Sequence, residues 1–328
     1  MQTLQEAELC FPLLLNSSCR RLVLPQSVRL VSVAALSFIS LLTVTLNLLV
    51  IISISHYRQL HTSTNLILLS LAVSDFLVGL RIFFQTLLLD GCWLLGDLMC
   101  SLFIGWDYII TSASIGNIVL VSIDRYLAVC DPMHYLTKFT RRRVRVCVCV
   151  CWAGSALWQT VMLRDNLKPS GRLVSCTGEC VVVIDHVYGF VDLLVTFIGP
   201  VGVIMVLYLR IFLVVVTQAR AIRSQITTFA AVKVRVKKSE IKAARNLGFV
   251  ILVFLICICP YFAVLILSQD NSINTSSDIL LMCLFNLNFC LNPIIYVLFY
   301  PWFRKSLKLV VSLQILRPGS RDTHFTYR

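Results

Sequence analysis

Residues 64–89 read TNLILLSLAVSDFLVGLRIFFQTLLL, and only Asp75 and Arg81 in this stretch are charged. A helix needs about 20 mostly apolar residues to cross the hydrocarbon core of a bilayer. Lipid offers no hydrogen-bond partner to an exposed backbone, so such a segment has to satisfy its own backbone groups as a helix. The stretch therefore predicts a membrane-spanning helix.

Six further stretches share this character, at about 29–55, 98–128, 145–163, 184–213, 246–268 and 278–299. Of the 328 residues, 58% are hydrophobic and 14% are charged, whereas a soluble domain carries about 25% charged residues. This composition excludes a soluble globular domain, a disordered chain and a coiled coil. The sequence predicts an all-α membrane protein, a bundle of seven transmembrane helices joined by short connections.

The distribution of Lys and Arg predicts the orientation in the membrane, because cytoplasmic loops are enriched in both. With the N-terminus outside and the C-terminus in the cytoplasm, most of the 29 basic residues lie inside, at Arg58 and in segments 138–145, 220–245 and 304–328. Residues 1–28 are then an extracellular tail and 29–300 the seven-helix domain. Residues 301–328 begin with an amphipathic helix on the membrane and end as a cytoplasmic tail. The net charge of +13 thus belongs to the inner membrane surface and its lipids, which excludes a nucleic-acid partner.

Cysteines and sequons support the same topology. Six of the 14 cysteines fall in segments placed outside, and an even number in an oxidising compartment predicts three disulfides: the six are Cys10, Cys19, Cys92, Cys100, Cys176 and Cys180. Two glycosylation sequons, at Asn16 and Asn274, also lie outside.

Aspartates within the predicted spans need a reason, because a carboxylate at the bilayer centre costs about 2.5–3.5 kcal/mol on insertion scales. Asp75 lies deep in the second span, and other spans place amide and hydroxyl groups at similar depth: Asn47, Ser114, Asn288 and Asn292. One carboxylate with several neutral oxygens is a ligand set for a small hard cation, here an allosteric Na⁺. The alternative is a hydrated polar network without an ion. The sequence indicates no other cofactor or metal.

Asp107 and Asp192 lie in the outer halves of their spans, with aromatic and small polar groups around them: Tyr108, Thr111, Trp158, Thr196, Tyr261 and Phe262. A half-buried carboxylate beside aromatic faces is suited to bind an ammonium group, by a charge-assisted hydrogen bond and cation–π attraction. Two carboxylates that face one cavity repel each other when it is empty. A ligand with two positive charges relieves that repulsion, so the pattern predicts an aliphatic diamine or polyamine.

A second charged cluster lies at the inner ends of the helices. Asp124-Arg125-Tyr126 closes the third span, and Glu240 lies twenty residues before Pro260 at the inner end of the sixth. Arg125 can pair with Asp124 and reach towards Glu240, and a breakable pair of this kind suits a conformational switch. No phosphate-binding loop and no zinc-spaced His/Glu pair is present, so the sequence does not indicate an enzyme.

These residues together resemble the rhodopsin-like, class A G protein-coupled receptors over nearly the whole chain: Leu46-Asn47-Leu48, Leu71–Asp75, Asp124–Tyr126, Trp152, Pro200, Pro260 and Asn292-Pro-Ile-Ile-Tyr296. Within that class the chain is similar to the trace amine-associated receptors, most of all the fish members. Three longer strings carry that similarity: Asp124–Tyr135 (DRYLAVCDPMHY), Lys238–Gly248 (KSEIKAARNLG) and Phe299–Lys305 (FYPWFRK).

The resemblance implies a role for several positions. Asp107 falls where amine receptors place the counter-ion of the ligand's ammonium, and Asp192 where some members carry a second acid associated with diamines. Cys100–Cys180 matches the disulfide of the receptor class, and Cys10–Cys176 with Cys19–Cys92 would match the additional bridges of the family. Most members are olfactory receptors of sensory neurons that act through a stimulatory G protein and cyclic AMP.

Some positions depart from the pattern of the family. Ile258 stands where the class has a tryptophan switch, Asn286 where a tyrosine closes over the amine counter-ion, and Phe285 where a small residue is usual. Arg81 lies in the outer half of its span and must be paired or reach the interface. If it reaches Asp107, it competes with the ligand's ammonium.

Two alternatives stay open beside a diamine receptor. One is a monoamine receptor, which uses a single carboxylate, Asp107 in the usual arrangement. The other is a small-solute transporter, which would need an internal repeat or interrupted helices that the sequence does not display.

Overall fold

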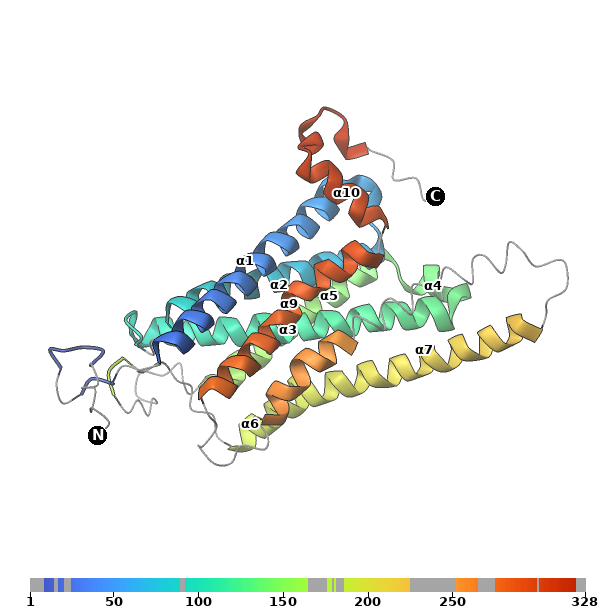
Figure 1. Ribbon diagram of the computed structural model, residues 1–328. Coiled ribbons are helices and arrows are strands. Elements are labelled where there is room, and N and C mark those ends of the chain that lie inside the picture. Colours follow the sequence, from blue (N-terminus) through green and yellow to red (C-terminus); the bar gives the residue numbers. More distant parts are fainter. Residues whose placement is uncertain are drawn as a thin grey trace.

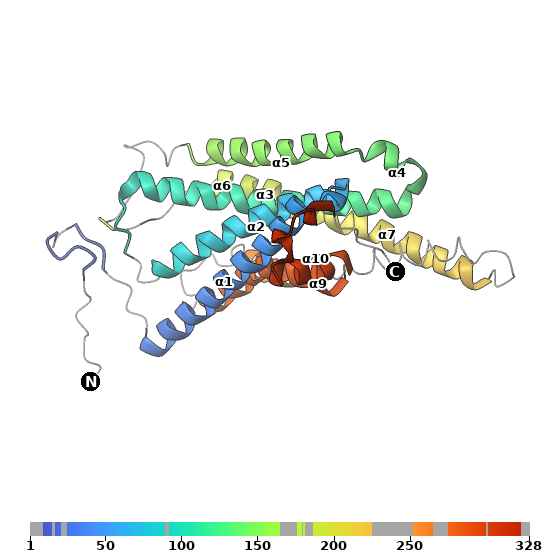
Figure 2. The ribbon, with the colours of Figure 1, turned by 90° about the horizontal axis from the view of Figure 1, so that it is seen from above.

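The protein is described by a computed structural model (Figure 1), and a view turned by 90° is given in Figure 2. The structure describes residues 9–14, 17–20, 25–88, 92–164, 176–178, 180, 186–224, 252–264, 275–299 and 301–322.

The predicted seven-helix membrane bundle is confirmed. Five helices are long and apolar enough to span a membrane, and within the described residues two shorter apolar ones complete the bundle. In chain order the helices are α1 (Gln26–His56), α2 (Ser63–Leu87), α3 (Gly96–Cys130), α5 (Arg141–Met162), α6 (His186–Leu193) continuing into α7 (Gly199–Ser224), the helix Leu252–Val264, and α9 (Thr275–Phe299). The short α4 (Pro132–Lys138) links α3 to α5, and α10 (Pro301–Val311) follows α9.

Local sequence explains where several helices begin. The Thr62 hydroxyl accepts a hydrogen bond from the backbone N–H of Asn65 at 3.2 Å and caps α2, and Thr140 caps α5 through Arg143 in the same way. Pro132 is the first residue of α4. The first N–H groups of a helix have no partner within the helix, so the missing N–H of proline costs no hydrogen bond there.

Helix α3 lies in the middle of the bundle and packs against α2, α5 and α7, while α1 packs against α2 and α9 (Figures 1 and 2). Gly116 permits the close approach of α3 to α5, because a Cβ atom there would collide with the Cys151 thiol. The interior holds Ile115, Phe197 and Phe254 in one apolar cluster. Polar side chains are buried beside these apolar layers, and they form the sites described below.

The fifth span is one helix interrupted by a wider, π-type turn at Leu194–Ile198 between α6 and α7. The N–H of Gly199 bonds the carbonyl of Leu194, five residues earlier. Pro200 has no N–H to donate, and its ring displaces the carbonyl four residues before it, so the helix widens there. The turn begins two residues after Asp192.

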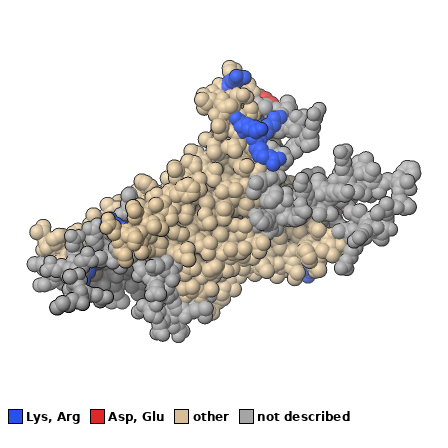
Figure 3. Space-filling model, in the orientation of Figure 1, with Lys and Arg blue, Asp and Glu red and all other residues tan. Residues whose placement is uncertain are grey.

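Helix α10 confirms the predicted amphipathic segment, with Trp302 and Phe303 buried against α1 and α9. Its exposed face carries Arg304, Lys305 and Lys308. In Figure 3 the described flank of the bundle is nearly free of charged side chains, while Lys and Arg gather around α10. The apolar flank suits contact with lipid, and the basic face suits the headgroup region.

Candidate ligand-binding and switching sites

Arg81 of α2 joins three helices at the outer end of the bundle. Its Nε lies 3.0 Å from Oδ1 of Asp107 on α3, its Nη2 donates to Oδ1 of Asn286 on α9 at 2.7 Å, and its Nη1 donates to Gln85. The Arg81 side chain is 6% exposed, whereas that of Asp107 is 32% exposed. The Asp107 side chain is therefore partly accessible and already paired with a buried guanidinium.

Thr111 and Asn286, the polar neighbours of the Arg81–Asp107 pair, differ in their hydrogen bonds. The Thr111 hydroxyl points to Oδ1 of Asp107 at 3.5 Å. Asn286 donates to the Met282 carbonyl at 2.8 Å while it accepts from Arg81, so its amide is committed to the protein. Among the described residues nothing donates to the second oxygen of Asp107.

Asp192 on α6 has no cationic partner in the described part of the chain. Trp158 Nε1 and Gln159 Nε2, both of α5, donate to Oδ1 of Asp192 at 2.8 and 3.2 Å. The Thr196 hydroxyl donates to the backbone carbonyl of Asp192 at 2.7 Å. The Asp192 carboxylate is thus held by two neutral donors. Gln159, only 2% exposed, was not predicted from the sequence; a polar residue inside a span is the signal that could have identified it.

Aromatic rings border this region. Phe262 stacks on Phe197 with ring centroids 3.8 Å apart, and Tyr261 packs on Phe285 at 4.8 Å. The Tyr108 hydroxyl is within electrostatic reach of both Asp107 and Asp192. The two carboxylates and the rings therefore belong to one region between α3, α6 and the helix Leu252–Val264.

At the inner end, Arg125 pairs with Asp124 as predicted, through Nη2 and through Nε at 2.9 Å. Asp124 is fully buried and also accepts from the hydroxyls of Tyr135 at 2.7 Å and Thr64 at 3.1 Å. Burial raises the pKa of Tyr135, on α4 outside the spans, to about 12, and the charge of Asp124 acts in the same direction. Thr64 and Tyr135 were not predicted as part of the switch. Tyr126 packs in the apolar cluster of Val129 and Ile211 instead.

Three disulfides join the six outer cysteines, and the structure corrects two of the expected pairings. Cys100–Cys180 is present, but Cys10 pairs with Cys92 and Cys19 with Cys176, in place of Cys10–Cys176 and Cys19–Cys92. The backbone explains the exchange, since Cys19 N–H donates to the Thr177 carbonyl at 2.9 Å and Thr177 N–H to that of Ser17. These bonds place residues 17–19 of the tail beside residues 176–178, so that Cys19 lies next to Cys176. Cys10 then pairs with Cys92.

The comparisons with known proteins agree with this architecture. Residues 46–296 match the model of the 7 transmembrane receptor (rhodopsin family). Trace amine-associated receptor 13c of Danio rerio is 36% identical over 98% of this chain and 97% of its own. Trace amine-associated receptor 7e of Rattus norvegicus is 34% identical (97% and 92%), and trace amine-associated receptor 8 of Homo sapiens is 34% identical (93% and 93%).

The chain belongs to the trace amine-associated receptors. It is thus a class A G protein-coupled receptor and not an enzyme, a multi-pass protein of the plasma membrane. Membership implies a small amine ligand outside and a heterotrimeric G protein inside, and it removes the transporter alternative.

Halfway through the membrane the receptor buries a carboxylate without a cationic partner among the described residues. Asp75 is fully buried and accepts from the Ser114 hydroxyl at 2.7 Å and from Asn292 Nδ2 at 2.8 Å. Asn47 donates to the carbonyls of Thr43 and Phe289, and its Oδ1 is buried with no hydrogen-bond partner in the described part of the chain. Asn288 is buried as well. A carboxylate and an oxygen without a donor fit the predicted Na⁺ in chemistry.

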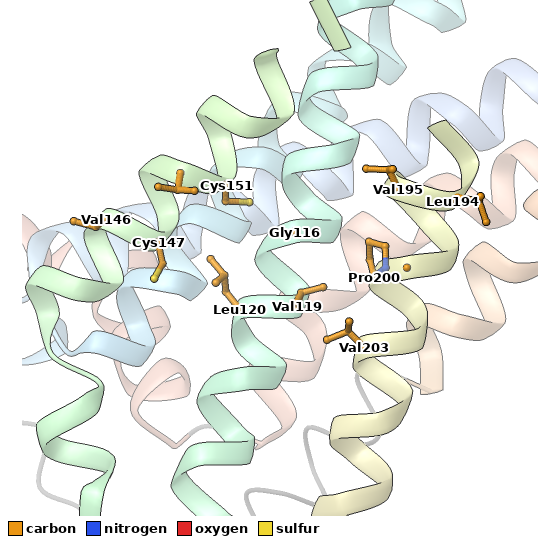
Figure 4. A pocket seen from close by; sticks show the side chains of 12 residues that line it. Gly116, Val119, Leu120, Val146, Cys147, Cys151, Leu194, Val195, Pro200 and Val203 are labelled. Carbon is orange, nitrogen blue, oxygen red and sulfur yellow. The ribbon is translucent and has the colours of Figure 1, made fainter. Parts of the chain in front are cut away.

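An apolar groove of about 640 Å³ runs along the outside of the bundle between α3, α5 and α7 (Figure 4). Val146, Val150 and Val195 line it together with Cys147 and Cys151. None of the described residues that line it is a carboxylate, so the groove is suited to lipid chains and not to an ammonium group.

The remaining predicted residues are only partly described. Asn16, Asn274 and Glu240 lie outside the described residues, as does the side chain of Tyr296. Pro260 lies within the helix Leu252–Val264, two residues after the buried Ile258, which packs among apolar residues at the position of the usual tryptophan.

Proposed function

We propose that this receptor binds an aliphatic amine in the outer cavity and activates a stimulatory G protein, which raises cyclic AMP in olfactory sensory neurons. The family supports an amine ligand and a G protein, and the two outer carboxylates support a cationic ligand. The G protein type and the cell type are proposed from the resemblance to olfactory members.

The ligand's ammonium binds Asp192. This assignment rests on one observation: among the described residues, Asp192 is the outer-cavity carboxylate that no cationic side chain compensates. One of its oxygens is held by Trp158 and Gln159, and the other has no donor in the described chain. An ammonium group there would add a charge-assisted hydrogen bond close to the aromatic rings of the cavity.

A diamine held between Asp107 and Asp192 is the second candidate. It is favoured by the open second oxygen of Asp107 and by Tyr108, which lies within electrostatic reach of both acids. The usual arrangement with Asp107 as sole anchor is less favourable, because Arg81 already neutralises that carboxylate.

Binding at the outer end has to be transmitted to the inner end. A ligand between Asp192 and the rings would draw α3, α6 and the helix Leu252–Val264 together outside. The inner end of that helix would then move outward and release Arg125 from Asp124 to meet the G protein.

A titration of cyclic AMP in cells that express the receptor tests the proposal, with straight-chain diamines each matched by the monoamine of equal length. We expect monoamines to be at least as potent as the matched diamines. Diamine responses that require two charges would favour the second candidate. Silence to all amines, with surface expression confirmed, would contradict both.

We further propose that Na⁺ binds Asp75 as an allosteric cation, with Ser114, Asn288 and Asn292 around it. When bound there, Na⁺ supplies the positive charge that the buried carboxylate lacks and favours the inactive bundle. We expect NaCl, compared with KCl, to lower amine affinity at least about fivefold in the wild type, and to have no such effect in Asp75→Asn. A salt effect that persists in Asp75→Asn would rule out this site.

A further inference from the structure

Among the described residues, one guanidinium and two carboxylates lie in the outer region between α2, α3 and α6, and their formal charges sum to a single negative charge. Arg81 and Asp107 form a pair with Nε and Oδ1 3.0 Å apart, while the partners of the Asp192 carboxylate in the described part of the chain are the neutral donors Trp158 and Gln159. We propose that Arg81 sets the number of positive charges that the ligand carries, limiting this receptor to ligands with one cationic group. This inference rests on the proposed amine function and adds the residue that determines specificity within it.

Arg81 already supplies the positive charge that a second ammonium group would bring to Asp107. The guanidinium contacts the same carboxylate from α2, with Nε 3.0 Å from Oδ1, and the Arg81 side chain is only 6% exposed. Arginine keeps its charge at any physiological pH, so the pair stays neutral whenever Asp107 is ionised. The electrostatic attraction of Asp107 for a second ammonium group would therefore be nearly cancelled by the charge of Arg81.

A ligand cannot readily displace Arg81, because three partners hold its nitrogens. If the guanidinium moved away, Oδ1 of Asn286 would lose its 2.7 Å hydrogen bond, and the side chain of Gln85 would lose its donor. Asn286 is buried and Gln85 is half-buried, and an unsatisfied buried acceptor is unfavourable. Arg81 is thus held in place beside Asp107.

It follows that a neutral side chain at position 81 would make the receptor prefer ligands with two cationic groups. In Arg81→Met, Asp107 would carry an uncompensated charge across the cavity from Asp192. A diamine that spans the two carboxylates gains a second charge-assisted hydrogen bond, worth about 10- to 100-fold in potency over the matched monoamine.

The experiment compares four receptors: wild type, Arg81→Met, Arg81→Lys and the double variant Arg81→Met/Asp107→Asn. Each is titrated with straight-chain diamines and monoamines of equal length, and the ratio of their potencies is measured by cyclic AMP. Protection of the detergent-purified receptor against thermal unfolding gives a readout independent of the G protein. The double variant is the matched control, because it removes both charges and keeps the cavity at one negative charge.

We expect Arg81→Met to shift the ratio about 10- to 100-fold towards one length of diamine. The lysine variant and the double variant should keep the ratio of the wild type. Since the expected change is a gain, misfolding cannot produce it; if Arg81→Met is not displayed at the surface, Arg81→Gln replaces it, with an amide that can still donate to Asn286.

An unchanged ratio in the neutral variant, beside a wild type that responds to monoamines, would overturn the role of Arg81 and leave the amine function standing. A wild type that already requires two charges would overturn it as well. A wild type that no amine activates or protects would instead contradict the proposed function, on which this inference rests.

Discussion

Asp192→Asn is expected to raise the amine concentration needed for half-maximal response by about 10- to 150-fold. A hydrogen bond to a charged group contributes about 1.5–3 kcal/mol, and about 1.4 kcal/mol corresponds to a factor of ten in binding. The substitution removes the charge but retains an oxygen that can accept from Trp158 and Gln159. The local fold should therefore survive, so that a loss of potency reports the lost ion pair. The measurement is a concentration–response curve at matched surface expression.

Asp322→Asn is a suitable control, because it makes the same chemical change on an exposed carboxylate 3.4 Å from Arg58, far along the chain from the cavity. It should leave potency unaltered, since exposed ion pairs contribute little. If Asp192→Asn responded to amines as the wild type does, Asp192 would not be the anchor, and the ligand would have to be sought at Asp107 or elsewhere.

Asp124→Asn is expected to raise the basal activity of the receptor about tenfold or more. Removing one partner of a buried ion pair commonly costs about 3–5 kcal/mol in the state that holds the pair. Asp124 is fully buried and bonded to Arg125, Thr64 and Tyr135, all at the inner ends of the helices. Neutralising it weakens the inactive arrangement and leaves Arg125 free to meet the G protein. Ligand-free nucleotide exchange on G protein in membranes measures the effect.

A graded variant separates a switch from general damage. Tyr135→Phe deletes only the hydroxyl that donates to Asp124 at 2.7 Å, so it should raise basal exchange in the same direction but by a smaller factor. Basal exchange that stays at the wild-type level in Asp124→Asn, with normal surface expression, would show that this pair does not restrain the receptor.

The helices could be predicted from sequence because lipid imposes one simple requirement on every span. Stretches such as 64–89 are apolar over the needed length, and α2 occupies Ser63–Leu87 accordingly. The pairing of Arg125 with Asp124 was also predictable, because the two opposite charges are neighbours in the sequence at the end of a helix.

Features that depend on how helices meet could not be predicted. Arg81 has a long flexible side chain, and only the packed positions of α2, α3 and α9 show that Asp107 and Asn286 lie within its reach. Six cysteines allow 15 connectivities, and the exchange between Cys10 and Cys19 follows from backbone bonds between the N-terminal tail and Thr177. Tyr135 joins the inner cluster because α4 folds back beneath α2 and α3, which no periodicity in the sequence encodes.

The π-type turn at Leu194–Ile198 also changes which way Asp192 faces. Each residue of a regular helix advances the direction of its side chain by about 100°. A widened turn accommodates an additional residue. The side chain of Asp192 therefore points about 100° away from the direction that it would have if a regular helix ran without interruption from Asp192 to Pro200. Two receptors with an acid at the same count from this proline can thus aim it at the ligand or at a neighbouring helix, and an alignment without gaps does not distinguish them.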